Sequence, residues 1–300
     1  MVASLPDHSG RDSEQPVSAA RSGGLPKWEA VLERMRSENF PVASKVLPPS
    51  VRQDLHALYG YFRLVDYAGD EAPGHRGELL DLLEVDLRRA YQGTARIPVL
   101  RALSPTVRKH GIPYEVLVKL IEANRQDQRV RRYETFADLL DYCALSAAPV
   151  GEAVLHVFDR ADKSLIELSD KICTALQILE HCQDIRADFN QGRIYIPAED
   201  MRRFGCAEEE LAGAHASTKL RGLVKFEVDR ARRMLAAGAP IVSQLSGMAR
   251  IAVSGYIAGG RATAAAFAAA GHDPLSTEIR PGRVRTFVEW GKLYALGRPW

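Results

Sequence analysis

Apolar residues recur at helical spacing along almost the whole chain, and this pattern constrains the fold more than any other feature. The first such segment, residues 25–38, carries Trp28, Val31, Leu32 and Met35. These positions correspond to i, i+3, i+4 and i+7, which lie on one face of an α-helix. Similar segments follow towards the C-terminus, without a series of strand patterns or an internal repeat. The sequence therefore predicts a single all-α domain over residues 26–300, with a core larger than that of a simple four-helix bundle.

The first 25 residues differ from the rest of the chain. They contain acidic residues and no apolar run, which predicts a disordered tail over residues 1–25 and argues against a secretory signal. The four cysteines are scattered without a C-x-x-C pair, a pattern typical of reduced thiols in the cytoplasm. A cytoplasmic location is therefore expected. The net charge of only +2 gives no global attraction to nucleic acid, so no nucleic-acid partner is expected.

A row of carboxyl groups marks residues 161–189, for which the pattern predicts one long helix. Glu180, Asp184 and Asp188 are spaced by four residues and follow Gln177 by one turn, so they share one side of that helix. Like charges at this spacing repel each other by about 0.2–0.5 kcal/mol per pair, and burial would raise that cost. A bound cation would remove the repulsion, and carboxylate oxygens are ligands that suit Mg²⁺.

A second acidic pair lies in "YGYFRLVDYAGDE". Asp66 and Asp70 are also four residues apart, and Arg63 precedes them by one turn on the same side. Two helices that face each other with such pairs would form a negatively lined cavity, which could bind a diphosphate through bridging Mg²⁺. The alternative is that both pairs lie on solvated helix surfaces. Their aromatic and aliphatic surroundings favour the cavity.

Together these motifs resemble the squalene/phytoene synthase family of head-to-head prenyl synthases. The matching elements are "SENFPVASKVLPPSVRQDLHALYGYFRLVDYAGDE", "RYETFADLLDYC", "PVGEAVL", "ALQILEHCQDIRADFNQGRIYIP" and "ARIAVSGYIAGGRA". They cover roughly residues 37–265 in the family's order. The resemblance implies an isoprenoid-synthase helical fold with a central cavity and a prenyl diphosphate substrate. It also implies Mg²⁺ as the cofactor.

The resemblance also assigns roles to individual residues. It implies that the metal ligands are Asp66, Asp70, Asp184 and Asp188. It implies that the substrate is contacted by Ser37, Asn39, Phe40, Arg63, Gln177 and Arg193. Lys45 is expected to add positive charge beside the diphosphate, and Tyr142 to face the carbocation. The residues expected to take part in the chemistry are Arg63, Arg193, Tyr195 and Glu180.

Departures from the family pattern bear on which reaction is catalysed. Tyr67 replaces the second Asp of the first motif, Glu180 replaces an Asn, and Gln183 stands where most members have Arg. Ala144 stands where several squalene and dehydrosqualene synthases have Tyr. "ENFPVAS" and the Gln before the second motif are similar to the hydroxysqualene synthase branch, which takes presqualene diphosphate to hydroxysqualene without NADPH. The alternatives are presqualene diphosphate, squalene, and phytoene or dehydrosqualene synthases, or a non-catalytic assembly factor.

Some of these positions have two interpretations. The Glu180 carboxylate could ligate a metal or orient the attacking water, or it could only pair with an arginine. Ala144 could open room for water or be neutral drift. The remaining side chains are interpreted structurally or as pocket lining. Leu139, Val150 and Val154 are expected to line the pocket, Thr135 to cap a helix, His181 to be structural, Pro149 to kink or divide its helix, and Gly255, Gly259 and Gly260 to allow close helix packing.

The C-terminal residues 280–300 interleave basic and aromatic side chains. A basic amphipathic helix can lie on an anionic membrane, which would place the protein peripherally on the inner face of the plasma membrane. The alternative is a packed terminal helix with a solvated basic face. Enzymes of the same pathway are further possible partners.

Overall fold

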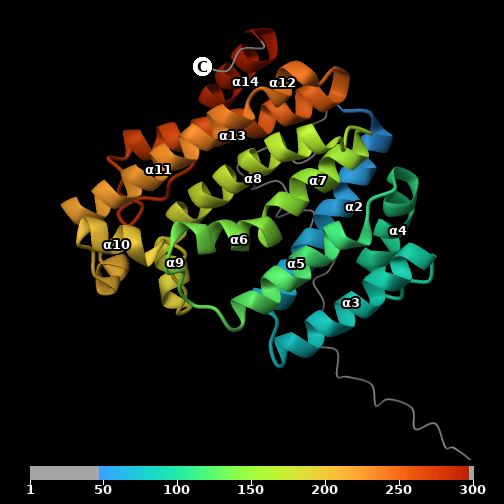
Figure 1. The fold of residues 1–300 in the computed structure, drawn as a ribbon, viewed down its shortest axis with the longest axis horizontal. Helices are drawn as coiled ribbons and strands as arrows, with labels where there is room; N and C mark the ends of the chain where they lie inside the picture. Colours follow the sequence, from blue (N-terminus) through green and yellow to red (C-terminus); the bar gives the residue numbers. More distant parts are fainter. Residues whose placement is uncertain (1–46, 297–300) are drawn as a thin grey trace, which may run out of the picture.

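The computed structural model describes residues 47–296, and regular structure in this range is helical, as predicted (Figure 1). The helices are α2 (Pro49–Asp66), η1 (Tyr67–Glu71), α3 (Arg76–Gln92), α4 (Pro98–His110), α5 (Tyr114–Asp127), α6 (Phe136–Ser146), α7 (Ala148–Val157), α8 (Lys163–Gln183), α9 (Ile185–Asn190), α10 (Ala198–Phe204), η2 (Glu208–Ala212), α11 (Thr218–Gly238), α12 (Ile241–Gln244), α13 (Gly247–Ala269) and α14 (Arg283–Leu296). Within the same range, one isolated parallel bridge joins Arg132 to Ile194. No helix between residues 47 and 296 has the length and apolar character needed to cross a bilayer.

Local sequence signals explain where several helices begin and end. Pro49 occupies the first turn of α2, where its missing N–H is not needed. Thr135 caps α6, as predicted: its Oγ accepts from the Asp138 N–H, and the Asp138 carboxylate accepts from the Thr135 N–H. This reciprocal arrangement satisfies two backbone donors at the helix start. Pro149 divides the predicted helix 134–158 into α6 and α7, because proline cannot donate the backbone bond that would continue it.

The buried side chains form two cores, one for each half of the chain. Helices α2 to α5 enclose the first core together with α7. Helices α6, α8, α11 and α13 contribute to the second, against which Trp290 of α14 packs. Helix α8 runs through the middle of the molecule, with α11 and α13 on one side and α6 and α7 on the other (Figure 1). This position brings its polar residues to the boundary between the two cores.

Both acidic segments lie where regular α-helix is interrupted, which corrects the prediction of one continuous helix over residues 161–189. Asp184 leaves the helical conformation with ψ near 10° and separates α8 from α9. The backbone bonds from Asp184 to Glu180 and from Asp188 to Asp184 persist, so the one-turn spacing of the acids is kept. On the facing segment, Asp70 lies in η1, a single turn of π-helix that follows α2. Such π-helical turns occur mostly as single turns and often at functional sites.

Candidate active site

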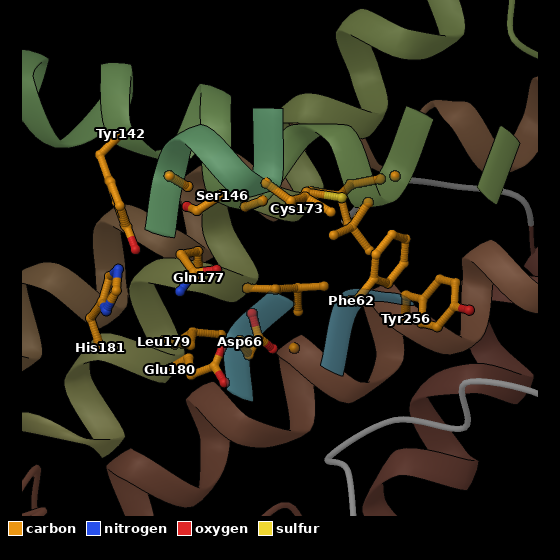
Figure 2. A pocket seen from close by; sticks show the side chains of 18 of the residues that line it. Phe62, Asp66, Tyr142, Ser146, Cys173, Gln177, Leu179, Glu180, His181 and Tyr256 are labelled. Atoms are coloured by element: carbon orange, nitrogen blue, oxygen red, sulfur yellow. The ribbon is translucent and has the colours of Figure 1, made fainter. Parts of the chain in front are cut away.

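A pocket of about 380 Å³ opens where the two cores meet. Helices α2, α5 to α9 and α13 line it, and Figure 2 shows it from close by. The pocket brings together ten of the predicted site residues: Arg63, Asp66, Asp70, Tyr142, Gln177, Glu180, Asp184, Asp188, Arg193 and Tyr195. The other four, Ser37, Asn39, Phe40 and Lys45, lie outside the described residues. The predicted convergence of the two acidic segments is therefore observed.

Two arginines contact the acids of the first segment. Arg193 donates to Asp70 at 2.6 Å, and its side chain is only 6% exposed. Arg63 donates to Asp66 at 3.3 Å and to Glu71 at 3.5 Å. The buried Nε atoms of Arg63 and Arg193 have no hydrogen-bond partner among the described residues. Each guanidinium therefore has donor capacity left for an anion in the pocket.

The acids of the second segment are held in an environment that disfavours their charge. Asp184 is exposed at its surface, but the protein around it partly desolvates the carboxyl group and raises its pKa, with a contribution from Glu278. Burial, and then the neighbouring Asp184, raise the pKa of Asp188 to about 7. The protein thus places two carboxylates where each would be stabilised by a cation. The repulsion that the spacing predicted contributes at Asp188, but burial is the larger cause of the raised pKa values.

The donor set fits magnesium shared with a phosphate. The four aspartates and Glu180 offer only oxygen ligands, which are those that Mg²⁺ prefers. Within residues 47–296, no three acidic, histidine or cysteine side chains converge into a ready-made metal cage. Mg²⁺ is typically held by one or two carboxylates, waters and substrate phosphates, so this open arrangement fits that mode of binding.

Sequence reasoning missed Asp127, which joins two pocket tyrosines. Its carboxylate accepts from the Tyr142 hydroxyl at 2.7 Å and from the Tyr195 hydroxyl at 2.9 Å. Burial raises the pKa of Asp127 to about 6. One signal could have found it: Asp127 lies one turn after Ala123 and two turns after Leu120, on the apolar side of its helix. An acid at such a position is rarely buried without partners.

The aromatic rings around this carboxylate are stacked. The ring of Tyr195 lies 3.9 Å from that of His181, at an interplanar angle of 11°. The Tyr195 ring also stacks on the Tyr133 ring, and the two ring centroids are 5.7 Å apart. The backbone bond from Ile194 to Arg131 holds the Tyr195 segment against the chain that precedes α6. Tyr195 is therefore fixed at the pocket wall by packing and by its bond to Asp127.

Several secondary predictions are corrected. Ala144 is exposed and is not among the residues that line the pocket, so it does not open the pocket, and neutral drift is the interpretation that remains. Leu139 is packed in the second core instead of the pocket, whereas Val150 and Val154 do line it. His181 packs structurally on Tyr195, as expected, and is also part of the pocket wall.

The glycine prediction is confirmed at Gly260, which also lines the pocket. A Cβ added there would lie 2.7 Å from Leu176 Cδ2. An alanine at this position would require the side chains of Leu176 on α8 and Leu235 on α11 to shift.

The fold and the pocket define the class of this protein as an enzyme of the all-α isoprenoid-synthase type. The structure is similar to that of a dehydrosqualene synthase in complex with ligand, with a TM-score of 0.80 and 22% identity over 91% of this chain and 97% of that one. It is also similar to squalene synthase HpnC from Alicyclobacillus acidocaldarius, with a TM-score of 0.74 and 39% identity over 82% of this chain and 94% of that one.

Sequence comparison gives the family. Residues 34–287 match the squalene/phytoene synthase family. The chain is 31% identical to the hydroxysqualene synthase of Zymomonas mobilis over 84% of this chain and 85% of that protein. It is 33% identical to the hydroxysqualene synthase of Sinorhizobium fredii over 75% and 76% of the two chains. The chain belongs to the squalene/phytoene synthase family.

Proposed function

We propose that this enzyme converts presqualene diphosphate to hydroxysqualene in squalene and hopanoid biosynthesis. The observation that carries the proposal is one pocket in which two acidic segments and two arginines meet a largely apolar interior. Such a pocket suits a substrate with a diphosphate at one end and long hydrocarbon tails at the other. The relatives named hydroxysqualene synthase support this choice of reaction.

The charged end of the pocket would bind the diphosphate. Asp66, Asp70, Asp184 and Asp188 would hold Mg²⁺, which supplies positive charge to a leaving diphosphate. Arg63 and Arg193 would donate to the same oxygens, since each has an Nε atom without a partner among the described residues. Donors already in place stabilise developing charge without reorganisation.

Residues before position 47 would complete the charged end. Ser37, Asn39 and Phe40 are proposed to lie in the segment that contacts the diphosphate, as the family resemblance implies. Lys45 is proposed to add positive charge beside it, and the Phe40 ring to stabilise the carbocation.

The aromatic side chains would stabilise the carbocation that remains after ionisation. Tyr142, Tyr195 and Phe62 supply rings at or around the pocket, and a ring face attracts a nearby cation by about 0.5–2 kcal/mol. The hydrogen bonds from Tyr142 and Tyr195 to Asp127 hold both rings in place. Asp127 is thus proposed to position the rings and not to contact the substrate.

Water would capture the cation, so the reaction would need no NADPH. The Glu180 carboxylate lies at the pocket wall, where it could ligate Mg²⁺ or orient a water molecule. The other candidate reactions of the family end differently. A presqualene diphosphate synthase releases presqualene diphosphate and does not ionise it further. In a squalene synthase, hydride from a nicotinamide cofactor captures the carbocation in place of water.

Product analysis by gas chromatography–mass spectrometry tests the proposal. Purified protein with Mg²⁺ receives farnesyl diphosphate or presqualene diphosphate, each with and without NADPH. The expected result is hydroxysqualene from presqualene diphosphate in the absence of NADPH. Accumulation of presqualene diphosphate from farnesyl diphosphate, or squalene formed only with NADPH, would assign another reaction of the family.

Helix α14 supports a further proposal, peripheral attachment to a membrane from the cytoplasmic side. Trp290 packs on α13 through bonds to Ile251 and Ser254, whereas Val284 and Phe287 remain 79% and 69% exposed beside several arginines. An apolar face flanked by basic residues suits an anionic lipid surface, and the product is itself lipid-soluble. Removal of residues 281–300 should abolish sedimentation with anionic vesicles. Unchanged sedimentation would favour the alternative, in which α14 only packs against the rest of the domain.

A further inference from the structure

Four polar side chains extend the pocket wall beyond the acidic segments. Tyr142 and Ser146 are one turn apart on α6, and Gln177 and His181 are one turn apart on α8. Figure 2 shows Ser146 next to Gln177 and Tyr142 next to His181, so the two pairs face each other across the same part of the pocket. The proposed function gives Tyr142 a role and the family resemblance assigns Gln177 to the substrate, but neither accounts for Ser146 or His181.

Two atoms of this group are buried without a partner. Ser146 Oγ and His181 Nε2 have almost no exposed surface, and neither forms a hydrogen bond within the described residues. His181 as a whole is only 6% exposed. Buried polar atoms in proteins are nearly always paired, so each exception calls for an explanation. Buried water molecules commonly fill this role, with about three hydrogen bonds to groups that are otherwise unsatisfied.

We propose that Ser146 and His181 hold the water molecule that ends the reaction. The inference rests on the proposed function and assigns the site of its last step. The water oxygen gives an electron pair to the carbocation and forms the new C–O bond. One hydrogen of the resulting oxonium is transferred to His181 Nε2, while Ser146 Oγ accepts a hydrogen bond from the other. His181 then releases its proton to solvent when the product leaves.

The surroundings of His181 suit this task. His181 is only 6% exposed, and burial favours the neutral imidazole, which does not repel a carbocation. In the tautomer with the proton on Nδ1, Nε2 carries the lone pair that the step needs. The stack on Tyr195 at 3.9 Å fixes the ring plane. The apolar residues around the pocket limit the number of water molecules that can reach the cation.

Product proportions test the assignment. Ser146→Ala removes one proposed partner of the water, and His181→Phe keeps a planar ring against Tyr195 but removes Nε2. Ser104→Ala is the matched control, because Ser104 is a buried serine outside the pocket that already donates a hydrogen bond to the Ala90 carbonyl. Each protein receives presqualene diphosphate and Mg²⁺ in ¹⁸O-labelled water. Diphosphate release, labelled alcohol and hydrocarbon products are measured separately.

The wild type and the control should release mainly ¹⁸O-labelled alcohol. Both variants should release diphosphate at a rate within about threefold of the wild type. Their ratio of alcohol to hydrocarbon should fall about tenfold, which corresponds to the loss of one hydrogen bond. The hydrocarbon would form by proton loss from an uncaptured cation.

Three results would overturn the inference. Unchanged product ratios in both variants would refute it and leave the proposed function intact. Slower diphosphate release with unchanged ratios would show that the two residues act on ionisation or packing instead. A wild type that forms no alcohol would refute the proposed function itself, and the water site with it.

Discussion

Asp188 should destabilise the metal-free protein at neutral and alkaline pH. Its pKa is raised from 3.8 to about 7, mainly by burial. The folded protein therefore binds this proton more tightly than the unfolded chain, and the free energy of unfolding falls as pH rises from about 4 through 7. The full difference corresponds to roughly 4 kcal/mol, at about 1.4 kcal/mol for each pH unit. Since Asp188 is partly exposed, screening by water reduces this to about 2 kcal/mol.

The substitution Asp188→Asn should remove this cost. Urea denaturation in the presence of a chelator should show a free energy of unfolding about 2 kcal/mol higher than wild type at pH 8, and less than about 1 kcal/mol higher at pH 5. Asp141→Asn, at an exposed position of α6, should change stability by no more than about 0.5 kcal/mol at either pH. Equal effects of Asp188→Asn at both pH values, or a destabilisation at pH 8, would show that the ionised Asp188 carboxylate does not destabilise the fold.

Two further predictions concern packing and the buried tyrosines. Asp127→Ala leaves the hydroxyls of Tyr142 and Tyr195 without their acceptor, so the free energy of unfolding should fall by about 2–4 kcal/mol; an unchanged urea midpoint would contradict this. Gly238→Ala places a Cβ 2.6 Å from Ile172 Cγ1 and should cost about 1–3 kcal/mol in thermal denaturation. Gly291→Ala, whose Cβ meets nothing within 4 Å, should be neutral or stabilise α14 by up to about 1 kcal/mol; similar effects of the two alanines would argue against close packing as the cause.

The helices could be predicted because their signals are local. Apolar spacing, the Thr135 cap and the Pro149 break depend on residues within a few positions of each other, and all three were confirmed. The π-helical turn at Asp70 and the break at Asp184 were not predicted. Helical spacing alone does not distinguish a regular helix from one that is interrupted for a single residue.

The site residues could be predicted only where they belong to a recognisable sequence motif. The four aspartates were identified by spacing and by resemblance, and the pocket unites them. Asp127 was not predicted as a site residue, because its partners Tyr142 and Tyr195 are 15 and 68 residues away in the chain. Of the two interpretations of Ala144, the one in which it opens room for water does not fit its exposed position outside the pocket, and that position depends on how α6 packs on its neighbours. Neither property can be read from a local pattern.

We propose that the two acidic segments bind one diphosphate through Mg²⁺. Calorimetric titration with an unreactive thiodiphosphate analogue of farnesyl diphosphate, with and without Mg²⁺, tests it most directly. We expect binding that requires Mg²⁺ and that weakens at least about tenfold in Asp66→Ala and in Asp184→Ala, one variant from each segment. Binding of equal strength without Mg²⁺, or in both variants, would contradict it.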